Sequence, residues 1–169
     1  AFNVPVLGVC YGMQLLNLKF GGTIEASDRR EYGPAELFPT SRTGIYEGLS
    51  EKSQVWMSHS DSVKELAASL TCIATTASIP VAAFKAAEGF TPYPMYGIQF
   101  HPEVTHSEQG KQLIKNFVVG ICACLQNWTP DGFIESTVAA IKKQVGNGKV
   151  VMALSGGVDS TVAATLIQK

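Results

Sequence analysis

The sequence has few charged residues and no excess of either sign. Lys and Arg together number 13, Asp and Glu 14, and the formal net charge at pH 7 is −1. Nucleic-acid-binding proteins usually carry a basic surface, so this balance argues against a nucleic-acid partner. No apolar run approaches the roughly 20 residues that span a bilayer, and the opening AFNVPV lacks the basic start of a signal peptide. We therefore expect a cytoplasmic protein without a membrane partner.

Cysteine is also scarce and irregularly spaced. No CxxC pair occurs among the four cysteines, Cys10, Cys72, Cys122 and Cys124, so we expect neither a disulfide framework nor a metal site. By contrast, 46% of the 169 residues are hydrophobic, which is enough for a substantial core. Residue 1 is not Met and the chain stops on TLIQK within a helical pattern, so we expect a piece of a longer protein.

The apolar patterns predict an α/β fold. VPVLGV (residues 4–9) is typical of a strand buried on both faces of a parallel sheet, and the next residues predict a helix that packs through Met13, Leu15, Leu16 and Phe20. The apolar pattern of residues 21–70 is shorter and less regular, with glycine, proline and serine between its segments. Three further strands are predicted in 70–77, 81–86 and 95–100, and a helix over 105–125 with Thr105 and Glu108 as a capping box.

A domain boundary is predicted at NWTP, which divides the chain into residues 1–127 and 128–169. Thr129 and Pro130 suit the cap and first turn of a new helix that continues to Val145. KVVMAL (residues 149–154) predicts another buried strand, followed by the loop SGGVDS and the start of a helix.

Cys10 lies at the centre of Gly8-Val9-Cys10-Tyr11-Gly12, a G-x-C-x-G pattern between the first strand and the first helix. This is the thiol counterpart of a nucleophile elbow, in which glycines make room for a sharp turn that exposes the reactive side chain. The helix N-terminus favours thiolate at this position. The alternative interpretation is a buried cysteine used as a small hydrophobic residue.

His101 is the candidate base for such a thiol. It follows a predicted strand, and Pro102 favours extended backbone at His101, so His101 and Glu103 tend to point the same way. The carboxylate can then fix the imidazole tautomer, which completes a Cys-His-Glu triad. A surface histidine at a strand end is the alternative.

GVCYGMQLL together with FHPEVTH resembles the class I glutamine amidotransferases. The resemblance implies a flavodoxin-like α/β layer in which Cys10 is the nucleophile, His101 the base and acid, Glu103 its partner, and the Tyr11 N–H an oxyanion donor. It also implies that Gln14, Ser60 and Asp61 bind glutamine. In the family pattern S-H-G-D a glycine stands where this chain has Ser60; if that glycine has positive φ, serine adds about 1 kcal/mol of strain.

The segment LSGGVDST resembles the pyrophosphate loop of the ATP pyrophosphatases, whose fold is an adenine-nucleotide α-hydrolase-like doubly wound domain. Small residues between a strand and a helix let backbone N–H groups face phosphate, and the G-x-x-x-x-G-K-[ST] spacing of a Walker loop is absent. The resemblance implies ATP binding by the loop residues Ser155, Gly156, Gly157, Val158, Asp159, Ser160 and Thr161. A structural strand-to-helix turn is the alternative.

The order of the two motifs is similar to a family of nucleotide-aminating synthetases. This resemblance implies that ATP, with Mg²⁺, adenylates the xanthine base of XMP, and that ammonia from glutamine then displaces AMP. It further implies a homodimer of the full-length chain. Two alternatives stay open: the glutaminase part of another amidotransferase, and a truncated chain that binds ligands without catalysis.

Overall fold

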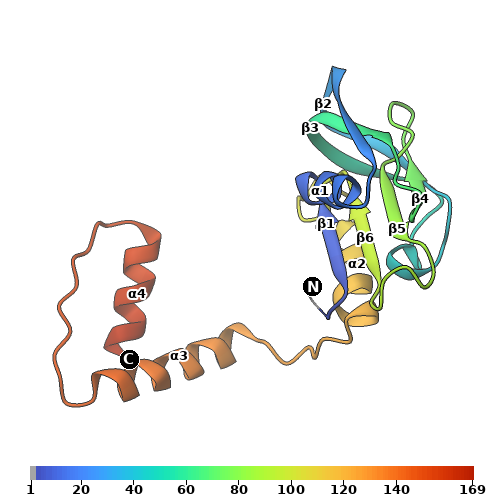
Figure 1. Cartoon of the computed structure of the whole chain (residues 1–169). Coiled ribbons are helices and arrows are strands. Elements are labelled where there is room, and N and C mark those ends of the chain that lie inside the picture. Colours follow the sequence, from blue (N-terminus) through green and yellow to red (C-terminus); the bar gives the residue numbers. More distant parts are fainter. Residues whose placement is uncertain (1–2) are drawn as a thin grey trace. The chain divides into compact units, whose positions relative to one another are not determined.

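The computed structural model describes residues 3–169, apart from the side chains of residues 27–30. The chain forms two compact units, Ala1–Cys124 and Leu125–Lys169, and each is described by itself (Figure 1). Within the described residues no helix has the length and apolarity needed to cross a bilayer.

A six-stranded mixed sheet forms the centre of the first unit. Its strands lie in the order β1-β6-β5-β4-β2-β3, with bounds β1 Val6–Val9, β2 Thr23–Pro39, β3 Ser53–Glu65, β4 Leu70–Thr75, β5 Ala83–Ala86 and β6 Met95–Ile98. The strands predicted within 70–77, 81–86 and 95–100 are β4, β5 and β6.

Parallel pairing is confined to β1 and β6, and the other neighbouring strands pair antiparallel. The prediction of a parallel sheet around residues 4–9 is therefore correct only for one pair. Short connections join β3 to β4 and β4 to β5, and short connections favour antiparallel neighbours. Only Gly8 of β1 is fully buried, so the expectation of burial on both faces was wrong for the rest of this strand.

The long β2–β3 ribbon extends beyond the other strands (Figure 1). Alternate residues of β3 are buried, among them Val55, Met57 and His59, as expected for a strand with one face on the core. The pairing register breaks between Ala26 and Glu31 of β2, which face Asp61 and His59 of β3. Residues 55–61 are thus part of one continuous strand.

Helix α1 (Tyr11–Lys19) begins directly after the turn that ends β1. Met13 is fully buried, and Leu16 and Phe20 pack at the margin of the same apolar cluster, whose other buried members are Val63, Ala67, Leu70, Phe84 and Met95. Leu15 was predicted to face the core but is 47% exposed, because its helical position lies off the face that Met13 and Leu16 share.

The helix predicted over 105–125 is shorter and begins later. α2 spans Gly110–Lys115 and continues as the π-helical segment η2, Asn116–Ile121. Thr105 and Glu108 do not cap it, because Glu108 bonds to β3 instead: its N–H donates to the Gln54 carbonyl at 3.1 Å, and its carboxylate accepts from the Gln54 N–H at 3.3 Å.

The second unit contains two helices. α3 (Pro130–Val145) begins as predicted, with the Thr129 hydroxyl accepting a 3.1 Å hydrogen bond from the Gly132 N–H. α4 (Val158–Gln168) follows the glycine loop. The predicted strand at 149–154 does not form: Val151 is 98% exposed and Leu154 62%, and no neighbouring strand is present in the described part of this unit. The doubly wound layer is therefore not in this chain.

Candidate active site

Cys10 occupies a strained turn between β1 and α1. Its φ of 52° and ψ of −108° are rare for a residue with a side chain, and such strain costs on the order of 1–3 kcal/mol. A 2.8 Å hydrogen bond from the Cys10 N–H to the Ile98 carbonyl of β6 holds the turn in place. The elbow geometry predicted from the G-x-C-x-G pattern is therefore present.

Of the two glycines in the motif, Gly8 is the one that has no room for a side chain. A Cβ on Gly8 would lie 2.7 Å from the backbone of Gly12 and 2.7 Å from Leu16 Cδ1. A Cβ on Gly12 would meet no atom within 4 Å. Gly8 thus lets α1 lie directly against β1, whereas the expected clash at Gly12 is absent.

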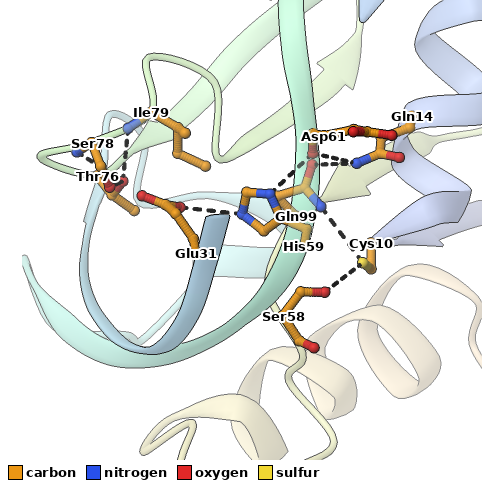
Figure 2. Close-up of polar contacts among 10 residues, drawn as sticks. All are labelled: Cys10, Gln14, Glu31, Ser58, His59, Asp61, Thr76, Ser78, Ile79 and Gln99. Atoms are coloured by element: carbon orange, nitrogen blue, oxygen red, sulfur yellow. Dashed lines mark hydrogen bonds and ion pairs between the residues drawn. The ribbon is translucent and has the colours of Figure 1, made fainter. Parts of the chain in front are cut away.

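The sulfur of Cys10 makes polar contacts with residues that are distant in the sequence (Figure 2). The thiol donates to the carbonyl of Ser58 on β3 at 3.7 Å, and the side-chain Nε2 of Gln99 donates to the sulfur at 3.6 Å. Residues from three separate parts of the chain therefore meet at this atom.

Burial raises the pKa of the Cys10 thiol, and the nearby Glu103 carboxylate adds to the rise. Hydrogen bonds from the Tyr11 backbone N–H and from Gln99 act in the opposite direction but are weaker. The expectation that the helix N-terminus favours thiolate is outweighed by desolvation. A thiol of this kind is protonated at neutral pH and needs a base before it can attack.

His101 and Glu103 form the contact that the sequence predicted. His101 Nδ1 lies 2.7 Å from Glu103 Oε1, so Nδ1 carries the proton that the carboxylate accepts and Nε2 is left as the basic nitrogen. No direct Cys10–His101 hydrogen bond occurs among the described residues. The two residues nevertheless follow the carboxyl ends of adjacent parallel strands, which lie at one edge of the sheet.

The His101 backbone is clamped to β3 at both of its polar atoms. Its N–H donates to the Trp56 carbonyl at 3.0 Å, and its carbonyl accepts from the Ser107 hydroxyl at 2.5 Å. The same hydroxyl accepts from the Trp56 N–H at 3.1 Å, which closes the clamp. The His106 ring lies 4.4 Å from the Trp56 ring, so His106 belongs to this turn and not to a helix as expected.

The three residues expected to bind glutamine are placed differently from one another. Gln14 is 6% exposed, and its Nε2 donates to the Asp61 carbonyl at 2.7 Å and to Gln99 Oε1 at 3.2 Å. Asp61 thus contributes its carbonyl to this network, and its side chain lies on the exposed side of β3. Ser60 is half-buried and its φ is not positive, so the strain expected from replacing glycine does not arise.

A buried contact between His59 and Glu31 lies behind the Asp61 carbonyl. His59 Nδ1 is 3.0 Å from this carbonyl and therefore donates to it, and His59 Nε2 lies 3.2 Å from Glu31 Oε2 without the angle of a hydrogen bond (Figure 2). The His59 side chain is 3% exposed and that of Glu31 13%. His59 is therefore a packed residue within β3.

The SGGVDS loop leads into helix α4, and this order of loop and helix was predicted. Gly156 has a φ of 82°, and Gly157 caps the helix. The hydroxyls of Ser160 and Thr161 both donate to the Gly157 carbonyl, at 3.0 and 2.9 Å. Asp159 lies in the first turn of α4.

Sequence reasoning did not assign roles to Gln99 or Ser107. Gln99 lies inside the GIQFHPEV segment. A polar amide directly after an apolar strand is a sequence signal that could have identified this residue. Ser107 had no such signal, because its role depends on how the turn after His101 folds onto β3. The same is true of Glu31, whose partner is set by the register break in β2.

The site brings together a half-buried cysteine on a strained turn, a histidine held by a carboxylate after the adjacent strand, and a buried amide against the sulfur, all on an α/β fold. The family profile for glutamine amidotransferase class-I matches residues 1–121. The chain therefore belongs to the class I glutamine amidotransferase family.

Among curated relatives, the chain is 50% identical over 168 residues to the GMP synthase (glutamine-hydrolyzing) of Cytophaga hutchinsonii. It is 46% identical over 167 residues to the protein of the same name from Lachnospira eligens. Each alignment covers 99% of this chain but only 32% and 31% of the relatives, so the chain spans about a third of their length.

A solved structure shows the same fold. A Thermoplasma acidophilum protein described as one of the subunits of a GMP synthase matches with a TM-score of 0.66 and 34% sequence identity. The match covers 72% of this chain and 59% of that protein.

Proposed function

We propose that the first unit hydrolyses the side-chain amide of glutamine, with Cys10 as nucleophile. This proposal rests on one observation: Cys10 and His101 follow the carboxyl ends of two adjacent parallel strands. Cys10 forms the strained turn after β1, and His101 follows β6. Glu103 holds the proton on His101 Nδ1 and leaves Nε2 as the base.

The first half of the reaction forms a thioester. His101 Nε2 takes the thiol proton as the sulfur bonds to the amide carbon, and the carbonyl electron pair moves to oxygen. The Tyr11 N–H, which already faces the sulfur, donates to that oxyanion. Collapse of the tetrahedral intermediate breaks the C–N bond, His101 returns its proton to the nitrogen, and ammonia leaves.

The second half restores the enzyme. His101 Nε2 takes a proton from water, whose oxygen attacks the thioester carbon. The C–S bond breaks, the sulfur recovers a proton from His101, and glutamate is released. We propose that Ser60 and Asp61 contact the amino-acid end of glutamine, since Ser58 on the same strand touches the sulfur. Gln14 supports this site from α1 through its bond to Asp61.

We further propose that the complete protein is a GMP synthase, in which the ammonia aminates XMP activated by ATP. The support is the high identity to curated GMP synthases over nearly the whole chain, including the second unit. The loop of residues 155–161 would bind the pyrophosphate of ATP with Mg²⁺, as the N-terminal cap of α4 and the glycine backbone permit. In this proposal, the sheet of that nucleotide domain and the contacts of the expected homodimer belong to parts of the complete protein outside residues 1–169.

Two nitrogen sources test both halves of this proposal in the full-length protein. With XMP, ATP and Mg²⁺ present, Cys10→Ala abolishes GMP formation from glutamine and retains it from ammonium. Cys124→Ala is the matched control, because that exposed cysteine lies far along the chain from the site, and it keeps both activities. Glutamine-dependent synthesis at the parent rate by Cys10→Ala would contradict the amidase proposal.

The glycine loop is tested separately with ammonium as the nitrogen source. Asp159→Ala weakens ATP-dependent synthesis, whereas Asp131→Ala, which changes the corresponding first-turn acid of α3, does not. Equal synthesis by the two variants would contradict ATP binding by this loop. Glutaminase activity without any amination of XMP would contradict the GMP synthase proposal and leave the amidase intact.

A further inference from the structure

Gln99 is fully buried at the end of β6, next to the sulfur of Cys10. Its backbone N–H donates to the Ala82 carbonyl at 2.9 Å, which fixes its place at the edge of the sheet. Its side chain uses both ends: Nε2 lies 3.6 Å from Cys10 Sγ, and Oε1 accepts from Gln14 Nε2 at 3.2 Å (Figure 2). Burial of a carboxamide is costly unless both ends are bonded, and both are bonded in this site.

The orientation of the Gln99 amide follows from its neighbours. The Asp61 carbonyl can only accept, so the Gln14 atom that meets it at 2.7 Å is the nitrogen. The second hydrogen of that nitrogen then requires an acceptor, which is Gln99 Oε1. A flipped Gln99 would set two N–H donors against each other, so the atom facing Cys10 is the donor Nε2.

The hydrogen bonds at the sulfur change in strength when the thiol loses its proton. In the thiol form, the S–H group donates to the Ser58 carbonyl and a sulfur lone pair accepts from Gln99. In the thiolate form, the Ser58 carbonyl has no proton to accept, whereas the bond from Gln99 becomes charge-assisted and stronger. Gln99 is therefore arranged to favour the reactive state.

We propose that Gln99 is a catalytic residue of this amidase, whose side-chain N–H stabilises and aims the Cys10 thiolate, with Gln14 fixing its orientation. The inference rests on the proposed function of Cys10. Consistent with it, the hydrogen bond from Gln99 lowers the pKa of the Cys10 thiol, although burial has the larger effect and raises it.

Gln99→Met in the full-length protein removes the donor at nearly constant side-chain length. The readouts are the steady-state constants for glutamine hydrolysis and the pH dependence of Cys10 alkylation by iodoacetamide, followed by mass spectrometry of the Cys10 peptide. We expect kcat to fall roughly tenfold to a hundredfold, as for loss of one hydrogen bond to a charged group, with a smaller change in KM. The alkylation midpoint moves up by about one pH unit.

Gln112→Met is the matched control, because the exposed Gln112 amide donates to Asn116 at the surface, and it leaves both readouts at parent values. Gln14→Met is the second variant: it frees the Gln99 amide to turn, and shifts the midpoint in the same direction by less. If Gln99→Met does not fold, the Gln14→Met shift decides the matter.

A folded Gln99→Met protein with the parent alkylation midpoint and kcat would overturn the inference, as would an unshifted Gln14→Met protein where the first variant is unfolded. Cys10→Ala distinguishes this failure from failure of the proposed function. If Cys10→Ala still hydrolyses glutamine, the amidase assignment itself is wrong. If Cys10→Ala is inactive and the Gln99 and Gln14 variants behave as the parent, only the role of Gln99 is lost.

Discussion

The backbone N–H of Cys10 donates a 2.8 Å hydrogen bond to the carbonyl of Ile98. This bond extends the parallel β1–β6 pairing by one step, past Val9 and Ile98. Because Gln99 and His101 follow Ile98 at once, the bond that holds the strained turn also sets the distance between the sulfur and the residues that act on it.

The close approach of α1 to β1 predicts that Gly8 cannot be replaced. Gly8→Ala brings a Cβ to 2.7 Å from the Gly12 backbone, which forces the helix away from the strand. We expect the free energy of unfolding to fall by about 1–3 kcal/mol, the usual cost of overpacking, in urea titrations of the full-length protein.

Gly12→Ala is the internal control for this experiment, since its Cβ meets no atom within 4 Å and alanine favours helix over glycine. It should be neutral or slightly stabilising. Equal destabilisation by the two substitutions would contradict a tight contact between α1 and β1 at Gly8.

The clamp on His101 predicts a role for the Ser107 hydroxyl. Ser107→Ala removes both the bond to the His101 carbonyl and the bond from the Trp56 N–H, so the imidazole loses its fixed approach to the site. We expect kcat for glutamine hydrolysis to fall about tenfold while KM changes little, because each neutral hydrogen bond that is lost is worth about 0.5–1.5 kcal/mol.

Ser107→Thr retains the hydroxyl and should recover part of the loss. The surface change Ser41→Ala removes a hydroxyl that bonds to the exposed Thr43, and it should have no effect. A Ser107→Ala enzyme with parent kcat would contradict the clamp.

The electrostatics of the site predict how the Cys10 thiol responds to pH. Burial and the Glu103 charge raise its pKa, so at a given pH less thiolate is present than on an ordinary cysteine. Alkylation of Cys10 should therefore reach half-maximal rate at a pH above about 8.5, the midpoint of a free cysteine. Glu103→Gln removes one raising charge and should move this midpoint down, opposite to Gln99→Met.

Glu103 also contacts the His101 imidazole, so its effect on the sulfur has to be separated from that of the ring. Measuring the Glu103→Gln midpoint in a His101→Ala background separates the carboxylate from the imidazole. An alkylation midpoint that moves up on loss of Glu103 would contradict a pKa-raising effect of this carboxylate.

The buried His59–Glu31 pair predicts a stability cost when one partner is changed. Glu31→Gln leaves the buried His59 imidazole without its carboxylate neighbour. We expect the free energy of unfolding to fall by about 1–3 kcal/mol. Glu36→Gln changes an exposed carboxylate on the same strand, paired with Lys52 at 2.9 Å, and should cost under about 1 kcal/mol. Equal losses would show that the buried pair contributes no more than a surface pair.

Local patterns in the sequence were sufficient for the elbow and the His101–Glu103 contact. The turn at Cys10 is set by five consecutive residues, and His101 and Glu103 lie two residues apart in the chain, so neither depends on distant pairing. The strands β4, β5 and β6 were predictable for the same reason, since each is a short segment rich in apolar residues.

Features that depend on pairing between distant segments were not predictable. The Gln14–Gln99 bond joins α1 to the end of β6, and the partner of His59 follows from a register break that no local pattern marks. Residues 149–154 show the converse: their apolar, β-branched composition favours a strand, but a strand needs a neighbour, and the described residues of the second unit contain none. The helix expected from residue 105 does not begin there, because residues 107 and 108 form hydrogen bonds with β3 instead.

The most direct test of the central claim is to trap the thioester. Full-length protein mixed with labelled glutamine and quenched in acid should carry a glutamyl group on the peptide that contains Cys10, and Cys10→Ala should carry none. Ammonia release without acylation of Cys10, or acylation at another cysteine, would contradict the account.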